Sequence, residues 1–216
     1  MTDLESLDLE FTQLGATGIH TSELQFGTWR FGKETEEGNL EIGEERAYEL
    51  LDAYEAAGGR YIDTADVYGG GESERWIGNW LENRDRERYT IASKIYWQIR
   101  DGDPNSRGTN RKNVRDRVDG ILERLDTDYV DVLYIHRWDD LTSAREMMKT
   151  LNALVDAGKV NYLGASTLRP NAWKVAKANE IAHREGWEPF SVLQPRYNLV
   201  DREIEGDYLE MARHYG

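Results

Sequence analysis

Short apolar runs recur about once every thirty residues along this chain, and longer stretches with helical periodicity lie between them. The run VDVLYIH at 130–136 is apolar almost throughout, which is typical of a parallel strand buried on both faces. Shorter runs of this kind are YIDTA at 61–65, TIASKI at 90–95, YLGAS at 162–166 and FSVLQ at 190–194. Together with the run that ends at Trp29, they predict six strands.

The stretches between these runs follow the i, i+3, i+4 spacing of amphipathic helices, over 47–57, 114–125 and 147–155. Gly58 and Gly158 are placed to end two of these helices. Strands that alternate with helices in this way imply a parallel sheet under a layer of helices. A β/α barrel would bring the carboxyl ends of all its strands to one face, whereas a doubly wound sheet would gather only those at its switch point.

Four polar residues stand at or just after the ends of these runs: Asp63, Tyr68, Lys94 and His136. An ammonium beside a phenol favours the phenolate and lowers the pKa of the phenol, so Lys94 is expected to make Tyr68 a stronger acid. Asp63 would hold the lysine, and a neutral His136 would donate to the same carbonyl oxygen. Singly, each residue also fits a turn, a strand end or a satisfied core histidine. Together they favour the barrel and indicate carbonyl reduction, with a nicotinamide cofactor as the hydride source.

Several segments resemble the aldo-keto reductase superfamily, in the order in which that family carries them. They are FGTW at 26–29, IDTADVYGGGESE at 62–74, ASK at 92–94, YIHRWD at 134–139, GKVNYLGAST at 158–167 and QPRYNL at 194–199. The resemblance implies a (β/α)8 barrel of the TIM type and reduction of a small aldehyde or ketone by NADPH or NADH. It also implies that residues 8–25 form the N-terminal hairpin that caps the bottom of the barrel.

The resemblance further assigns roles to individual residues. Tyr68 matches the general acid, Asp63 and Lys94 match its supporting pair, and His136 matches the residue that orients the carbonyl. Ser166 and Gln194 match residues that bind the nicotinamide carboxamide. Thr167 stands where the family usually has asparagine, and a hydroxyl replaces only one of the two amide hydrogen bonds. The aromatic residues that follow the first, third and fourth strands are expected to wall the substrate pocket or to pack beneath loops; they are Trp29, Trp97 and Trp138.

A complete barrel has eight strands and about 250 residues, whereas this chain has 216 residues and six predicted strands. We therefore expect one domain over 1–216 that is incomplete at its C-terminal end. Its open edges would favour self-association. Two other interpretations fit the same residues: a cofactor-sensing regulatory subunit of this fold, and an inactive truncated remnant.

Acidic residues outnumber basic ones by 41 to 27, which gives a net charge of −14 and a pI near 4.8. This charge disfavours binding to nucleic acid and is typical of proteins kept soluble at high salt, so a halophilic source is one interpretation and an ordinary acidic enzyme the other. The chain has no cysteine, no apolar run of membrane-spanning length and no HExxH-type spacing. We expect a cytoplasmic protein without membrane contact or bound metal.

Overall fold

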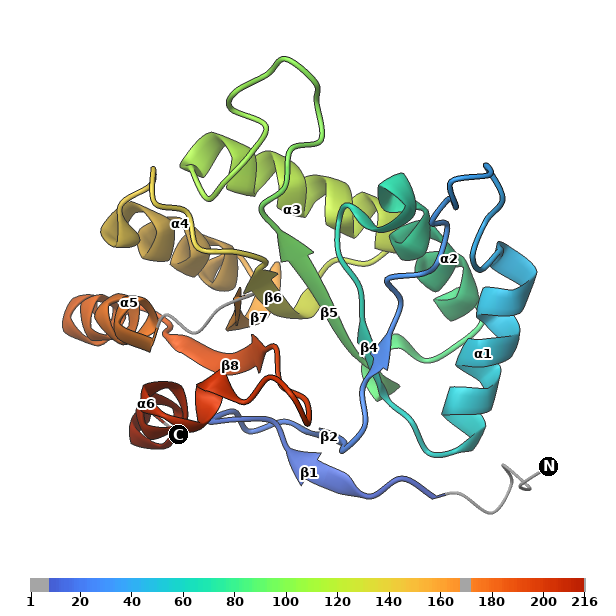
Figure 1. Cartoon of the computed structure of the whole chain (residues 1–216), viewed down its shortest axis with the longest axis horizontal. Coiled ribbons are helices and arrows are strands. Elements are labelled where there is room, and N and C mark those ends of the chain that lie inside the picture. Colours follow the sequence, from blue (N-terminus) through green and yellow to red (C-terminus); the bar gives the residue numbers. More distant parts are fainter. Residues whose placement is uncertain (1–7, 168–171, 216) are drawn as a thin grey trace.

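The computed structural model describes residues 8–167 and 172–215, which form an α/β half-barrel. Its six parallel strands pair in chain order, so β3 and β8 lie at the two edges of the sheet. β8 is labelled at one of these edges in Figure 1. The strands are β3 (Phe26–Gly27), β4 (Tyr61–Asp63), β5 (Thr90–Ile95), β6 (Val130–Ile135), β7 (Val160–Thr167) and β8 (Phe190–Pro195). The six predicted strands and the partial barrel are confirmed.

Six α-helices form an arc around the outer face of the sheet (Figure 1). They are α1 (Glu44–Ala56), α2 (Glu72–Leu81), α3 (Arg111–Leu125), α4 (Ala144–Asp156), α5 (Ala172–Glu185) and α6 (Asp207–Tyr215). The periodicity correctly predicts α1, α3 and α4, and both α1 and α4 end just before a glycine with positive φ, Gly58 and Gly158. Short 3₁₀ turns complete the described elements: η2 (Tyr68–Gly71), η3 (Arg86–Arg88) and η4 (Glu203–Glu205).

The segment after β4 combines a glycine-rich turn with helix α2, which was not among the helices expected from the sequence. Gly69 has a φ of 57°, and a Cβ on it would lie 2.5 Å from the carbonyl oxygen of Phe31. A residue with a side chain is therefore disfavoured at this position, both by the backbone conformation and by the lack of space. Helix α2 begins directly after this turn, at Glu72.

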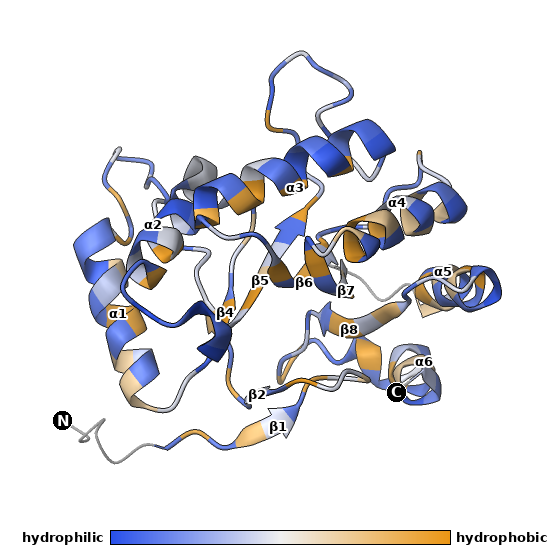
Figure 2. Ribbon diagram, turned by 180° about the vertical axis from the view of Figure 1, so that it is seen from behind, coloured by the Kyte–Doolittle hydropathy of each residue, from blue (hydrophilic) through white to orange (hydrophobic). Residues whose placement is uncertain are grey.

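The main hydrophobic core lies between the sheet and the helices. Every residue of β5 and β6 is buried. Hydrophobic residues gather on the strands and on the helix faces turned toward them, whereas the outer faces of the helices are mostly hydrophilic (Figure 2). Both faces of each central strand are thereby buried, because the helices cover one face and the other faces the barrel interior.

A smaller cluster fills the barrel interior, and the N-terminal hairpin reaches it. Strands β1 (Phe11–Gln13) and β2 (His20–Ser22) pair antiparallel, and Leu14 in the connecting loop belongs to this inner cluster. The backbone N–H of Ala16 donates to the carbonyl oxygen of Ser191 at 3.3 Å. The hairpin thereby connects the start of the chain with β8.

Candidate active site

Asp63, Tyr68, Lys94 and His136, called here the tetrad, come from three neighbouring strand units. Asp63 ends β4, Tyr68 begins η2, Lys94 lies near the end of β5 and His136 directly follows β6. Because the strands are parallel, their carboxyl ends lie at one end of the half-barrel. The fold thus brings all four residues together there.

Lys94 and Asp63 form a buried ion pair. The ammonium of Lys94 donates to Asp63 Oδ2 at 2.6 Å and to the carbonyl oxygen of Thr64 at 2.9 Å. The lysine side chain is 1% exposed. Burial lowers the pKa of Lys94, while the carboxylate of Asp63 opposes this shift. The pair therefore fixes a positive charge at the bottom of the site.

The phenol of Tyr68 lies beside this charge. The Lys94 ammonium is 5.2 Å from the centre of the Tyr68 ring. Burial raises the pKa of Tyr68, and the carboxylates of Asp63 and Asp66 raise it further. This direction is opposite to the lowering expected from Lys94, because desolvation of the phenolate and two negative charges outweigh one ammonium already paired with Asp63. Tyr68 thus keeps its proton at neutral pH, as a group that donates a proton must.

His136 faces Tyr68 and is neutral at physiological pH. The two ring centres are 5.9 Å apart in an edge-to-face arrangement. Burial, followed by the charge of Lys94, lowers the pKa of His136 to about 4. Its Nδ1 is buried and has no hydrogen-bond partner among the described residues. A neutral imidazole in this position can donate a hydrogen bond to a substrate without adding a second positive charge.

Tyr68 and His136 line a pocket of about 520 Å³. Trp29 and Trp97 also line it, and the Trp97 ring lies edge-to-face with His136 at 6.1 Å. Trp138 does not line this pocket; it packs against the main hydrophobic core. The remaining lining residues were not expected from the sequence: Lys33, Val67 and Gly69.

A second group of buried charges lies behind the tetrad, and the motif analysis did not identify it. Asp66 accepts a hydrogen bond from Arg117 Nε at 2.6 Å, and both side chains are almost fully buried. Glu74 accepts from Ser93 Oγ at 2.5 Å and from Arg124 Nε at 2.7 Å. Burial raises the pKa of Asp66, although Arg117 acts against this shift.

Asp66 connects this group to the strand that carries the lysine, because its backbone N–H donates to the carbonyl oxygen of Lys94 at 3.2 Å. Arg117 and Arg124 stand seven residues apart on α3, two helical turns, and so share the face that packs on α2. That spacing is the sequence signal that could have indicated that the two arginines face the same neighbouring segment, where each has its own acidic partner.

The residues matched to the nicotinamide site lie side by side on β7 and β8. Ser166 and Gln194 are direct partners in the register of these strands. Ser166 is 8% exposed, and neither side chain forms a hydrogen bond with another part of the chain that the structure describes. Their hydroxyl and amide groups are thus available to a carboxamide. Thr167 ends β7, and its side chain lies outside the described residues.

Asp139 connects two loops near the site through hydrogen bonds. It accepts hydrogen bonds from the backbone N–H of Thr109 at 2.8 Å, from that of Leu141 at 3.0 Å and from the Thr142 hydroxyl at 2.7 Å. These bonds join the long loop after β5, which carries Trp97, to the loop after β6. A single carboxylate therefore holds one wall of the pocket.

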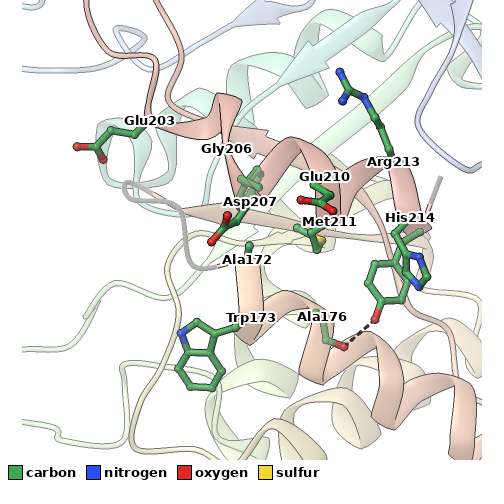
Figure 3. A pocket seen from close by; sticks show the side chains of 12 residues that line it. Ala172, Trp173, Ala176, Glu203, Gly206, Asp207, Glu210, Met211, Arg213 and His214 are labelled. Carbon is green, nitrogen blue, oxygen red and sulfur yellow. Dashed lines mark hydrogen bonds between the residues drawn. The ribbon is translucent and has the colours of Figure 1, made fainter.

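A wider pocket, about 980 Å³, lies away from the tetrad between α5 and the η4–α6 segment (Figure 3). Trp173 and Ala176 of α5 line one side and Met211 of α6 the other, and the Tyr215 hydroxyl donates to the Ala176 carbonyl oxygen at 3.3 Å. Within residues 8–167 and 172–215, no group of three acidic or histidine side chains could hold a metal ion. In the same part of the chain, no helix has the length and apolar character needed to cross a membrane.

Comparison with known proteins shows which family this chain resembles. The model of the aldo/keto reductase family matches residues 23–216. An aryl-alcohol dehydrogenase of Pestalotiopsis microspora is 39% identical over 206 residues, which are 93% of this chain and 53% of that protein. A putative aryl-alcohol dehydrogenase of Saccharomyces cerevisiae is 39% identical over 231 residues, 100% of this chain and 61% of that protein.

A norsolorinic acid reductase of Aspergillus flavus is 38% identical over 208 residues, 93% of this chain and 53% of that protein. This chain therefore spans a little more than half the length of these curated relatives. The matched region includes the strands that carry the tetrad.

Proposed function

The chain belongs to the aldo/keto reductase family, and we propose that it reduces aldehydes or ketones to alcohols with NADPH or NADH. The observation that carries this proposal is the position of Tyr68 between the buried Lys94–Asp63 pair and a neutral His136, with Tyr68 and His136 lining the same pocket. This set of groups can donate a proton to a carbonyl oxygen and stabilise the charge that develops on it.

Each member of the tetrad has a distinct part in the proposed reaction. The Tyr68 hydroxyl donates its proton to the carbonyl oxygen, and His136 orients that oxygen with a hydrogen bond. Lys94 stabilises the phenolate that Tyr68 becomes, because its fixed charge lies 5.2 Å from the ring. Asp63 holds Lys94 in place and favours its charged form.

The nicotinamide cofactor would supply the hydride. Ser166 and Gln194 would bind its carboxamide, since they are paired across β7 and β8 and their polar groups are not used by other described residues. Thr167, the next residue, would contribute through its hydroxyl.

We propose aromatic carbonyl compounds as substrates. Trp29 and Trp97 line the pocket and offer flat apolar surfaces to an aromatic ring. The names of the relatives, aryl-alcohol dehydrogenase and norsolorinic acid reductase, agree with a preference of this kind.

The decisive test is Tyr68→Phe, assayed with 4-nitrobenzaldehyde by the loss of NADPH or NADH absorbance. The substitution removes the transferred proton and keeps the ring, so kcat should fall by about 10²-fold or more. Cofactor affinity, followed by quenching of tryptophan fluorescence, should stay within about twofold because Tyr68 is not assigned to cofactor binding. The surface variant Tyr129→Phe is the matched control and should keep the wild-type rate. A Tyr68→Phe protein with most of the wild-type rate would exclude Tyr68 as the acid.

We also propose that copies of the chain associate through the edges of the half-barrel, because β3 and β8 each have a strand partner on one side only among the described residues. Sedimentation at several protein concentrations tests this proposal, and a monomer at all of them would refute it. A net charge of −14 is typical of proteins that work at high salt, where screening reduces repulsion between like charges, so we propose a cytoplasm of high ionic strength as the environment of this protein. Cofactor binding should therefore be measured in low and in molar salt.

A further inference from the structure

Basic side chains stand beside the aromatic walls of the substrate pocket. Lys33 lines the pocket, and its ammonium lies 4.2 Å from the centre of the Trp29 ring. It shares its acidic partner with a second cation, because Glu41 binds Lys33 through Oε1 at 2.7 Å and Arg30 through Oε2 at 2.7 Å. Arg30 lies 5.9 Å from the centre of the same ring, so two cations and the carboxylate that they share stand at this side of the pocket.

A further cation lies beside Trp97, the other tryptophan of the pocket. The guanidinium of Arg137 lies 5.8 Å from the centre of the Trp97 ring, and Arg137 forms no ion pair within the described parts of the chain. The loop after Lys33 also carries exposed acidic residues, but none of them lines the pocket; they are Glu34, Glu36 and Glu37. Arg30, Arg137 and these carboxylates all lie outside the lining, so among the described residues Lys33 is the charged side chain that a molecule in the pocket meets.

The floor beneath the pocket does not cancel this charge, because its buried groups are paired one to one. Asp63 pairs with Lys94, Asp66 with Arg117 and Glu74 with Arg124. The charge near a bound molecule is therefore set by the charged side chains at the walls of the pocket and not by the buried pairs beneath it. A local positive charge is notable in a protein whose net charge is −14, since the rest of the surface repels anions.

We propose that Lys33, assisted by Arg137, makes the site selective for aromatic carbonyl compounds that carry an anionic group, such as a carboxylate, on the ring. This inference rests on the proposed reductase function and extends it to the substrate class. The carbonyl group lies at Tyr68 and His136, the ring lies between Trp29 and Trp97, and the anion contacts the Lys33 ammonium. Lys33 is a specificity-determining residue in this arrangement and takes no part in proton transfer.

The test compares two aldehydes of nearly equal shape, 4-formylbenzoate and its neutral analogue 4-formylbenzamide. At low salt, wild-type protein should show a kcat/KM about fivefold higher for the carboxylate, and the difference should lie mainly in KM, because an exposed ion pair contributes modestly to binding. Lys33→Met should remove most of this preference and Lys33→Arg should restore it. The preference should also shrink as salt is raised toward 1 M, because salt screens exposed charges.

Lys149→Met is the matched control, because it removes the same charge from the exposed face of α4. It should keep the wild-type preference. Equal kcat/KM for the two aldehydes, or a preference that survives Lys33→Met, would overturn the inference while the reductase function stands. Wild-type protein that reduces neither aldehyde nor 4-nitrobenzaldehyde would overturn the proposed function and this inference with it.

Discussion

Arg117 should be one of the most costly side chains to remove from this protein, although it takes no direct part in the proposed reaction. It is 2% exposed, and its ion pair with Asp66 lies in the low-dielectric region between the sheet and α3. Arg117→Met leaves the Asp66 carboxylate buried without a counter-ion, a change that typically costs about 3–5 kcal/mol. Domains of this size are stable by only about 5–15 kcal/mol, so the variant should lose a large part of its free energy of unfolding.

The double variant Asp66→Asn, Arg117→Met separates the lost charge pairing from the lost volume. It leaves no uncompensated charge, and its remaining cost is that of a buried amide, about 1–3 kcal/mol. The double variant should therefore be more stable than Arg117→Met alone by about 2 kcal/mol. Such a difference is the coupling energy that a double-mutant cycle measures between two residues in contact.

The loss in Arg117→Met should grow with pH. Burial already raises the pKa of Asp66, and removal of Arg117 raises it further. Between the ordinary aspartate pKa near 4 and this raised value, the folded state holds a proton that the unfolded state has released, so stability falls as pH rises. The deficit relative to wild type should be smallest near pH 4 and largest near pH 8.

Urea unfolding, followed by tryptophan fluorescence at pH 4, 6 and 8, measures the stability lost in Arg117→Met, the stability difference from the double variant and the pH dependence of the loss. Arg115→Met, on the exposed side of the same helix, is the control and should change stability by no more than about 0.5 kcal/mol. An Arg117→Met protein within about 1 kcal/mol of wild type at pH 8 would contradict this prediction. So would a double variant whose loss of stability equals the sum of the two single losses.

Three further predictions concern the site and its supports. The pKa of His136 is about 4 in the folded protein and near 6.5 in the unfolded chain, so wild-type stability should fall as the pH drops from 6.5 to 4. In His136→Gln the difference between the melting temperatures at pH 7 and at pH 4.5 should be smaller than in wild type. Gly164→Ala should cost about 1–3 kcal/mol in urea unfolding, since its Cβ would lie 2.4 Å from the Tyr134 ring, whereas Gly43→Ala, with open space around it, should not. Asp139→Ala should raise KM more than it lowers kcat, because the loop that holds Trp97 loses its anchor; an unchanged KM would contradict this.

The sheet and the tetrad were accessible from the sequence for a physical reason. Strands buried on both faces leave uninterrupted apolar runs, so VDVLYIH stands out from its surroundings. Polar residues at or just after the ends of such runs meet at one end of a parallel sheet, which is why the positions of Asp63, Lys94 and His136 could be grouped before the structure was known.

The parts that were missed involve buried charge. Helix α2 carries an apolar stripe that was overlooked, and the residues that this stripe does not indicate are the buried Ser73 and Glu74. Charged residues are normally exposed, and nothing in the local sequence of Asp66 or Arg117 indicates that both are enclosed. The direction of the pKa shift of Tyr68 was missed for the same reason, since it depends on burial by segments distant in the sequence.

The pairing of strands in chain order also bears on how the protein is made. Each strand from β4 to β8 pairs with the strand that precedes it in the sequence, so its partner has already left the ribosome when it emerges. Successive βα units can then dock one at a time on a growing template, without a search for distant partners. By contrast, the hydrogen bond from Ala16 to Ser191 joins residues far apart in the chain and can form only after β8 is synthesised. The hairpin loop thus becomes fixed late, after the tetrad units have already been assembled.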